Sequence, residues 1–424
     1  MAISLHILIL VILFYGAYRR ISVVRSGRGA LFCGALVVKL SLTLLSFYIH
    51  TEVFKASDLA AYWHDAQSIA DLMENKAVSY FTYLIDSQGS GDSPELLLKN
   101  QPRALLFAKI LSFFYVITAG SAWLTAVWLS ACSFAAAWYL FVVINRYFPA
   151  LTPAIAFSLL FYPSAVFWSS GIQKEALAVP IIFTATALLF PFLLKKKPAA
   201  PIIRVAAALM LCIVLWYIKY YYAIVFVPLL FATALIGELS RRREYFSGRV
   251  NLQFILWISI LISGVLIGRN MHIALSSEHF LSLVARTHHQ VAASSVPENV
   301  AYMEELKATP LSFIRYAPQA FITGLFRPLP GDGTGSILSW GVALENGLLL
   351  IVCLLGFVFF IRQKFRPCSM AVIAGLVYCL SLAVFLAYGM PNFGSLMRYK
   401  ASFLPFLLLL ALAPFYQTYP GGKK

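Results

Sequence analysis

The sequence predicts an all-α polytopic membrane protein with about eleven transmembrane helices and two large outer loops. Only 12% of its 424 residues are charged, about half the share found in an ordinary soluble domain. Hydrophobic residues make up 61% of the chain, and the mean hydropathy is +0.81. Apolar runs long enough to cross a bilayer recur from one end to the other. This composition excludes a soluble globular protein of the same length.

Each expected span is an apolar run that ends at polar or basic residues. The runs are 3–18, 30–50, 122–144, 153–168, 176–194, 202–217, 220–236, 254–268, 340–360, 370–388 and 403–416. Lys39 lies near the middle of the second run, where a charge is costly, so we expect it to face the protein interior and have a partner. Because no repeat or soluble segment interrupts the pattern, we treat residues 1–424 as one transmembrane domain.

The net charge of +16 reflects membrane topology rather than binding to nucleic acid. The basic clusters that we assign to one side are Arg19–Arg28, Arg146, Lys195–Arg204, Arg241–Arg249, Arg362–Arg366 and Lys423–Lys424. Cytoplasmic loops carry an excess of Lys and Arg, so these clusters are expected inside the cell. Outer loop 1 (51–121) and outer loop 2 (269–338) then face outside. We expect a multi-pass protein of the bacterial inner membrane with its functional surface on the outer face.

Outer loop 1 opens with Ser57–Ala66, which carries two carboxylates, an imidazole and two aromatic rings within ten residues. A helix is predicted over 58–74. Further along, Gln101-Pro102-Arg103 precedes an apolar stretch at 104–118. A full span there would move Lys195–Lys197 to the outside. The charge pattern therefore favours an interfacial or re-entrant helix.

Four stretches resemble the GT-C glycosyltransferases, a family of polytopic enzymes that use sugars linked to polyprenyl phosphate. They are Ser57–Tyr62, Gln101–Arg103 with its following helix, Trp128–Phe148 with Phe161–Ser164, and Met397–Lys400 with Leu404-Pro405. The resemblance implies transfer of a sugar from a polyprenyl-phosphate donor to an outward-facing glycan or lipid acceptor, with inversion at the sugar. Two features depart from the family pattern: an extra leading helix and the turn Trp168–Glu175.

Asp58 is the candidate catalytic base, the role that the resemblance implies for the acidic residue of this loop. A carboxylate just beyond a membrane helix can face a half-wet cleft, where partial desolvation raises its pKa. Capping of the following helix is the alternative role for Asp58. Asp65 shares its helix face seven residues later, and Asp65 or His64 could be the base instead. Tyr62 is a candidate sugar-binding ring, although an interfacial aromatic belt predicts such residues too.

Cations at the outer membrane boundary are candidates for binding the donor phosphate. They are Lys174, Arg327 and Arg398, with Arg103 behind them, and Glu175 lies beside Lys174 in the same turn. An arginine can bind two phosphate oxygens at once, whereas a lysine acts as a point charge. The alternative is that these side chains reach from helix ends to the polar boundary without binding substrate.

No metal or cofactor is expected, because the sequence has no ligand spacing typical of a metal site and no nucleotide-binding loop. The expected partners are a polyprenyl-phosphate-linked sugar, a glycan or lipid acceptor and membrane lipids, without nucleic acid. One alternative is an O-antigen-type polysaccharide polymerase or ligase, which would need Arg286, Arg315 or Arg327 rather than Asp58. The other is a lipid or glycan transporter, a class that typically has internal repeats or broken helices.

Overall fold

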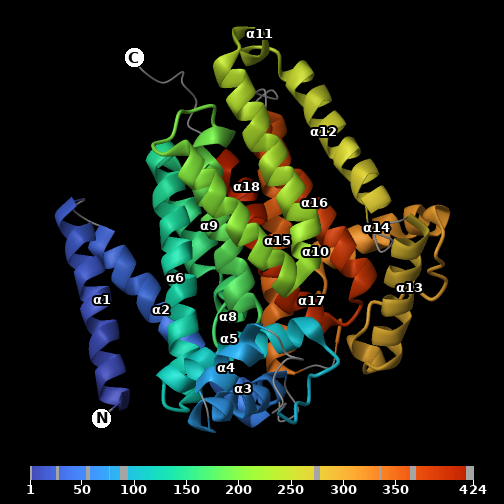
Figure 1. The fold of residues 1–424 in the computed structure, drawn as a ribbon. Helices are drawn as coiled ribbons and strands as arrows, with labels where there is room; N and C mark the ends of the chain where they lie inside the picture. Colours follow the sequence, from blue (N-terminus) through green and yellow to red (C-terminus); the bar gives the residue numbers. More distant parts are fainter. Residues whose placement is uncertain are drawn as a thin grey trace. The chain divides into compact units, whose positions relative to one another are not determined.

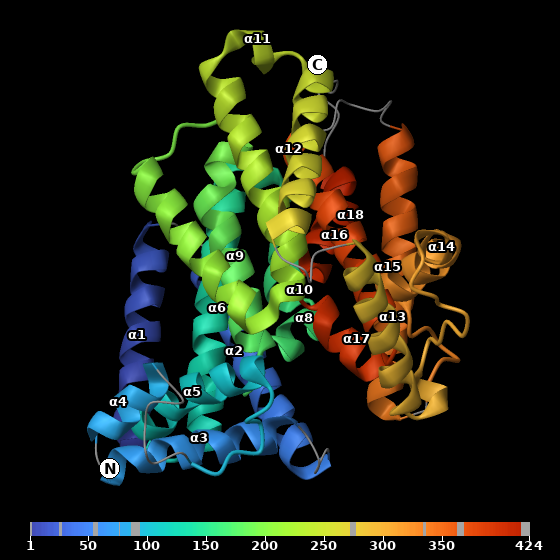
Figure 2. The ribbon, with the colours of Figure 1, turned by 45° about the vertical axis from the view of Figure 1, so that its right-hand side comes forward.

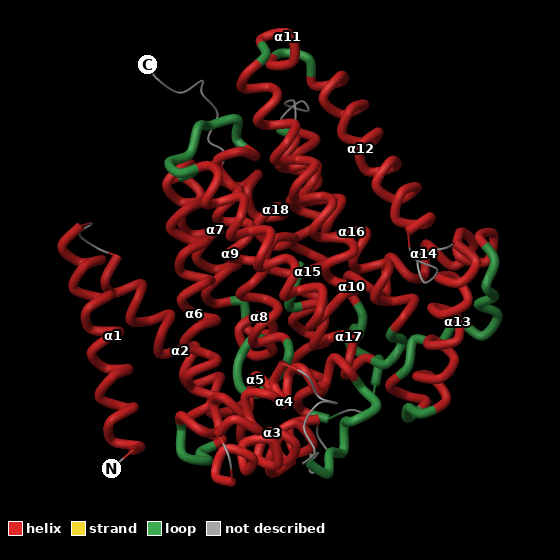
Figure 3. The backbone as a smooth tube through the Cα atoms, in the orientation of Figure 1, coloured by secondary structure: helices red, strands yellow, loops and turns green. Residues whose placement is uncertain are grey.

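The computed structural model describes residues 2–24, 28–53, 58–75, 77–85, 94–271, 277–333, 336–362 and 369–416. Within these ranges the regular elements are helices, and β-structure is limited to an isolated bridge between Val300 and Asn392 (Figure 3). The prediction of an all-α protein is therefore confirmed. Several residues named above lie outside the described ranges: Ser57, Arg25, Lys364, Arg366, Lys423 and Lys424.

The chain divides into two compact units, and each is described by itself. The first comprises Met1–Trp138, Val166–Ile181 and Ile213–Tyr220, and the second comprises Tyr139–Ala165, Ile182–Cys212 and Tyr221–Lys424. Three long helices, α6 (Ala122–Tyr147), α9 (Glu175–Leu193) and α10 (Pro201–Arg242), contribute residues to both units.

The first unit contains the helices of the N-terminal third of the chain. They are α1 (Ala2–Val24), α2 (Arg28–Tyr48) with a π-helical turn (Ile49–Val53), α3 (Asp58–Asn75), α4 (Ala77–Ile85) and α5 (Pro102–Ile117). In both ribbon views α3, α4 and α5 lie side by side (Figures 1 and 2). Tyr62 of α3 packs edge-on against Phe107 of α5, with 5.0 Å between the ring centres.

The second unit contains the C-terminal helices. They are α7 (Thr152–Ala156), α11 (Glu244–Ser247), α12 (Val250–Met271), α13 (Ser277–Ala293), α14 (Pro310–Phe326), α15 (Ile337–Arg362), α16 (Met370–Gly389), α17 (Phe393–Lys400) and α18 (Leu404–Tyr416). Helices α14 and α16 approach so closely that a Cβ on Gly324 would lie 2.1 Å from the Ala383 carbonyl oxygen. Only glycine fits at that position.

Six helices among the described residues are long and apolar enough to cross a membrane, or seven if α17 and α18 form one span bent by 62°. The six are Arg28–Val53, Ala122–Tyr147, Glu175–Leu193, Pro201–Arg242, Ile337–Arg362 and Met370–Gly389. They are compatible with an integral membrane protein. The predicted number of about eleven spans is not confirmed. Three of the missing spans correspond to shorter apolar helices: Ser4–Arg19, Pro149–Phe161 and Val250–Leu266.

The predicted span at 153–168 is broken for an identifiable reason. After α7 the chain forms a π-helical turn, Phe157–Phe161, and α8 (Pro163–Trp168) begins anew beyond it. Pro163 has no backbone N–H to continue the helix, and Tyr162 before it is extended, with φ −65° and ψ 113°. The two expected spans at 202–217 and 220–236 instead lie in the 42-residue α10, whose backbone is non-helical at Lys219.

The stretch predicted as an interfacial or re-entrant helix forms α5, which has 16 residues and is not among the helices long and apolar enough to span. It begins at Pro102, a residue that is well suited to the first turn because its missing N–H has no partner there. Buried α5 residues pack with Leu59, Tyr62 and Ala66 of α3 in one hydrophobic cluster. Its position relative to a bilayer stays a prediction.

Candidate functional site

Helix α3 presents Asp58 at its N-terminus. Asp58 is the first helical residue and is exposed, and a carboxylate is favourable there because it faces the positive end of the helix dipole. Leu59 and Tyr62 are buried one residue and one turn further on. Asp58 and Tyr62 are four residues apart, so they lie on neighbouring positions of one helix face.

Asp65, the alternative base, lies in a different environment. It is fully buried, and its two carboxylate oxygens accept backbone N–H groups from Leu97 and Leu98, each at 2.9 Å. His64 places its Nδ1 3.2 Å from Asp65 Oδ1 while its side chain is 54% exposed. Asp65 therefore ties the segment before α5 to α3.

The turn between Trp168 and Glu175 is held by contacts inside the first unit. Gly171 adopts the left-handed conformation with φ +79°, and its N–H donates to Ser130 Oγ at 2.9 Å. The Gln173 amide donates to Ser46 Oγ at 3.2 Å. Because few side chains tolerate that backbone conformation, glycine fixes the path of the turn. This turn positions Lys174 and Glu175.

Lys39 supports the same turn from α2. Its ammonium group is buried and donates to the Ser169 carbonyl at 2.8 Å and to Ser169 Oγ at 2.9 Å. It also contacts Ser133 Oγ and the Val166 carbonyl, at 3.2 and 3.3 Å. The prediction that Lys39 faces the interior and has a partner is confirmed.

A buried ion pair joins the turn to the break in α10. Lys219 Nζ lies 2.6 Å from Glu175 Oε1, and the two side chains are only 3% and 1% exposed. Glu175 begins α9, whereas Lys219 has φ −145° and ψ 72°, outside the helical region. The sequence analysis missed Lys219. The sequence feature that could have identified Lys219 is its position between two apolar runs, 202–217 and 220–236, which were interpreted as separate spans.

Two cations lie over aromatic rings beside this ion pair. Lys174 Nζ is 5.0 Å from the centre of the Tyr62 ring, and the Arg103 guanidinium carbon is 3.8 Å from the centre of the Tyr220 ring. Such contacts hold a cation at a defined place. We use the name charged cluster for these residues together with Asp58, which lies on α3 one turn before Tyr62; the cluster comprises Asp58, Tyr62, Arg103, Lys174, Glu175, Lys219 and Tyr220.

The two remaining predicted cations, Arg327 and Arg398, belong to the second unit. Arg327 forms a double hydrogen bond with Asp332, at 2.9 and 2.7 Å, and Asp332 also accepts the Leu329 N–H at 2.8 Å. Hydrogen bonding from Arg327 holds the pKa of Asp332 below its usual range. Arg398 is half-buried on α17. Arg327 thus has a carboxylate partner, which the sequence analysis did not foresee although Asp332 is only five residues away.

His288 holds α13 against neighbouring segments of the second unit. His288 Nδ1 lies 2.9 Å from the Tyr388 carbonyl oxygen, and its Nε2 accepts the Met303 N–H at 3.0 Å. Burial lowers the pKa of His288 to about 4, so the ring is neutral at pH 7. Within the described residues, no three His, Cys, Asp or Glu side chains are grouped so that they could hold a metal ion.

The charged cluster gathers one exposed carboxylate, one buried ion pair, two further cations and two aromatic rings from four separate segments of one unit. Such a set can accept a proton from a hydroxyl group and bind an anionic leaving group. No family model, curated protein or solved structure matches this chain.

Proposed function

We propose that this protein is a membrane glycosyltransferase that moves a sugar from a polyprenyl-phosphate donor to a glycan or lipid acceptor on the outer face of the bacterial inner membrane. One observation carries the proposal. The exposed Asp58 carboxylate lies one helical turn from Tyr62, whose ring contacts the Lys174 ammonium group. The proposed base and the proposed phosphate-binding cation therefore lie on neighbouring segments.

Asp58 is the proposed base. It takes the proton from the acceptor hydroxyl as that oxygen forms a bond to the anomeric carbon of the donor sugar. The bond from that carbon to the phosphate oxygen breaks, and polyprenyl phosphate leaves with the electron pair. Asp65 suits this role less well, because both of its oxygens already accept backbone N–H groups. His64 stays an alternative proton acceptor, because its side chain is exposed and an acceptor hydroxyl could reach it.

Lys174 and Arg103 are the proposed cations for the departing phosphate. Lys174 contacts the Tyr62 ring and Arg103 contacts the Tyr220 ring, and these contacts hold both cations at defined places. Glu175 is the proposed positioning residue: its pairing with Lys219 fixes the start of α9 beside Lys174. Arg327 is a weaker candidate because Asp332 already binds its guanidinium group. Arg398 and Tyr62 stay proposed substrate-binding residues.

Transfer assays with radiolabelled sugars on polyprenyl phosphate test this proposal in membranes that contain the protein. We expect Asp58→Asn to lower the rate of label transfer at least ~100-fold, the usual contribution of a general base. Asp71→Asn, an exposed carboxylate of the same helix, is the matched control and should retain the wild-type rate. Full transfer by Asp58→Asn at normal expression would refute the assignment of the base.

The two cations have a separate test. Lys174→Gln and Arg103→Gln should weaken binding of polyprenyl monophosphate, measured by native mass spectrometry, whereas Asp58→Asn should leave that binding unchanged. If all three variants bind the lipid as the wild type does, the phosphate site lies elsewhere.

A transporter is the second candidate, because the 62° bend between α17 and α18 and the break at Lys219 are typical of broken transporter helices. Proteoliposomes separate the two functions. Substrate movement across the bilayer without a covalent product would favour the transporter over the transferase.

A further inference from the structure

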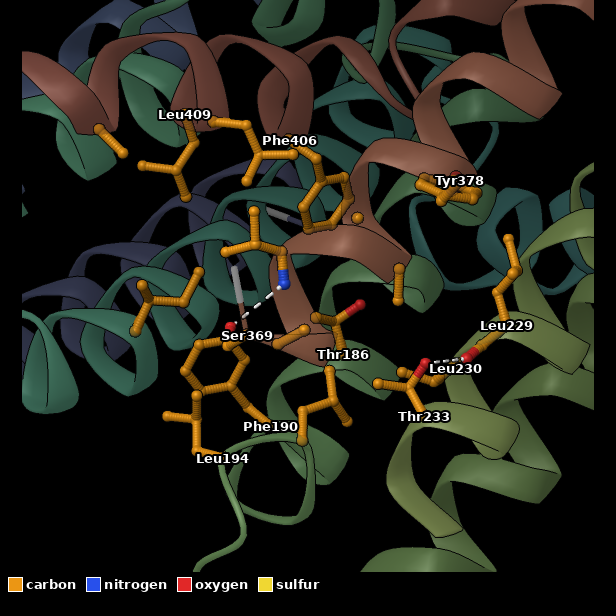
Figure 4. A pocket seen from close by; sticks show the side chains of 18 of the residues that line it. Thr186, Phe190, Leu194, Leu229, Leu230, Thr233, Ser369, Tyr378, Phe406 and Leu409 are labelled. Carbon is orange, nitrogen blue, oxygen red and sulfur yellow. Dashed lines mark hydrogen bonds between the residues drawn. The ribbon is translucent and has the colours of Figure 1, made fainter. Parts of the chain in front are cut away.

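Residues of the second unit on five helices, α6, α9, α10, α16 and α18, line a cavity of about 220 Å³ (Figure 4). Phe190, Leu229 and Phe406 supply large apolar side chains to its wall. Small residues of α16 also line the cavity; they include Ala371, Ala374 and Gly375. Small side chains at those positions leave the space unfilled.

The polar groups in the wall are already engaged within the protein. Thr186 Oγ1 donates to the Ile182 carbonyl at 2.8 Å, and Thr233 Oγ1 donates to the Leu229 carbonyl at 2.6 Å. The Tyr378 hydroxyl donates to the Ser402 carbonyl at 3.2 Å. A buried water needs two to four polar partners, and an apolar cavity of ~150 Å³ stays dry. The occupant that suits this cavity is therefore apolar.

One end of the cavity adjoins a basic surface. Phe148 and Leu194 line the cavity, while Arg146 and Lys195–Lys197 lie within two or three residues of them in the chain. Arg146, Lys196 and Lys197 are exposed. Lys195 donates to the Ser247 carbonyl at 3.3 Å, which brings the end of α11 to the same end of the cavity. An apolar cavity thus ends beside a concentration of positive charge.

We propose that this cavity binds one acyl chain of an anionic phospholipid, whose headgroup phosphate contacts Arg146, Lys196 and Lys197. The apolar wall accepts the chain and the adjoining cations neutralise the headgroup. The proposal stands apart from the transferase activity, since none of these residues belongs to the charged cluster.

The charge pattern favours a membrane phospholipid over a polyprenyl phosphate as the occupant. The basic clusters Lys195–Arg204 and Arg241–Arg249 are those expected on the cytoplasmic side, where anionic phospholipids supply a negative surface. The donor lipid of the proposed transfer reaction would bind at the opposite face.

Photo-crosslinking of the wild-type protein is the first test, because it needs no variant. The probe is phosphatidylglycerol with a diazirine on one acyl chain, and the labelled residues are mapped by mass spectrometry. We expect adducts on α9, α16 and α18 at residues such as Phe190, Gly375 and Phe406. Adducts confined to outward-facing residues of α15, such as Leu348 and Phe357, would overturn the proposal.

A cavity-filling variant provides the second test. A Cβ on Gly375 would meet Leu410 Cδ1 at 3.3 Å, and both residues line the cavity, so Gly375→Leu should occupy the space of the chain. Native mass spectrometry should show at least a fivefold loss of bound phosphatidylglycerol. Gly264→Leu, an apolar-helix glycine with open space around it, is the matched control and should bind normally.

The headgroup is tested by Lys196→Gln and Lys197→Gln. Each should weaken phosphatidylglycerol binding roughly fivefold, the effect expected for one basic residue at an anionic surface. Lys307→Gln, an exposed lysine of outer loop 2, is the control. Equal binding of phosphatidylcholine and phosphatidylglycerol, or tighter binding of polyprenyl monophosphate than of either, would refute an anionic phospholipid site. Unchanged binding in Gly375→Leu would refute the cavity as its location.

Discussion

The two units each contain an ion pair with a different character. In the first unit, Glu175 and Lys219 are 44 residues apart and their side chains are almost fully buried. In the second, Arg327 and Asp332 are five residues apart, and their side chains are 29% and 20% exposed. The first pair joins distant segments, whereas the second closes a local turn. We therefore expect loss of the first to disturb the fold and loss of the second to disturb little.

Lys219→Met should have the largest effect, because it leaves the Glu175 carboxylate buried without its 2.6 Å partner. Removing one member of a buried pair costs ~3–5 kcal/mol, which thermal or denaturant unfolding in mild detergent would detect. Combining it with Glu175→Gln should restore much of the loss. The exposed Lys99 gives the control variant Lys99→Met. If Lys219→Met lowers the free energy of unfolding by less than ~1 kcal/mol, the buried pair contributes no more than an exposed one, and the proposed difference between the two pairs is wrong.

Asp65→Asn should have the second-largest destabilising effect. The amide retains one acceptor oxygen but turns an NH₂ group toward the second backbone N–H, so the tie to Leu97 and Leu98 weakens. Hydrogen bonds to a charged group are worth about 2 kcal/mol each. Hydrogen exchange at residues 94–101 would report the local opening, with Asp71→Asn as control. Unchanged exchange there would show that other contacts hold the segment.

His288 tests whether a buried long-range contact also matters in the second unit. The folded-state pKa of His288 is about 4, below its usual 6.5, so unfolding takes up a proton between these values. Stability should fall as the pH decreases from about 6.5 to about 4. His288→Gln should flatten this part of the profile of melting temperature against pH, whereas the exposed His279→Gln should not. Identical slopes in wild type and His288→Gln would contradict the neutral assignment.

Arg327→Gln should have the smallest effect. The partly exposed Arg327–Asp332 pair is screened by solvent, so its removal should cost about 1 kcal/mol or less, and raised salt should reduce the difference. Unfolding at low and high ionic strength measures both. A loss as large as that of Lys219→Met would show that the local turn supports the second unit more than its exposure suggests.

Sequence reasoning succeeded where a local pattern decides the structure. The helix expected over 58–74 is α3, and the proline-led stretch that follows Gln101 is α5. The interior position of Lys39 followed from the cost of a charge in a membrane span. The interruption between the runs that end at 217 and start at 220 corresponds to the non-helical backbone at Lys219.

Other features depend on contacts between distant segments, which no local pattern reveals. The backbone partners of Asp65 are 32 and 33 residues away, so no local pattern separates the role of Asp65 from that of Asp58. The partner of Glu175 could not be identified until α10 was placed beside the turn. The break at Pro163 could have been predicted from the proline itself. The prediction of a continuous span over 153–168 instead followed the apolar composition of the run.

The turn at Gly171 also sets a criterion for recognising relatives of this protein. Its left-handed backbone disfavours other residues, and a Cβ there would lie 3.3 Å from Ser46 Oγ. Glu175 and Lys219 should be gained or lost together in evolution, because either one alone would be a buried charge. Sequences that keep this glycine, a glutamate four residues later and a lysine at the next interruption of the apolar pattern should share the site even where overall identity is low.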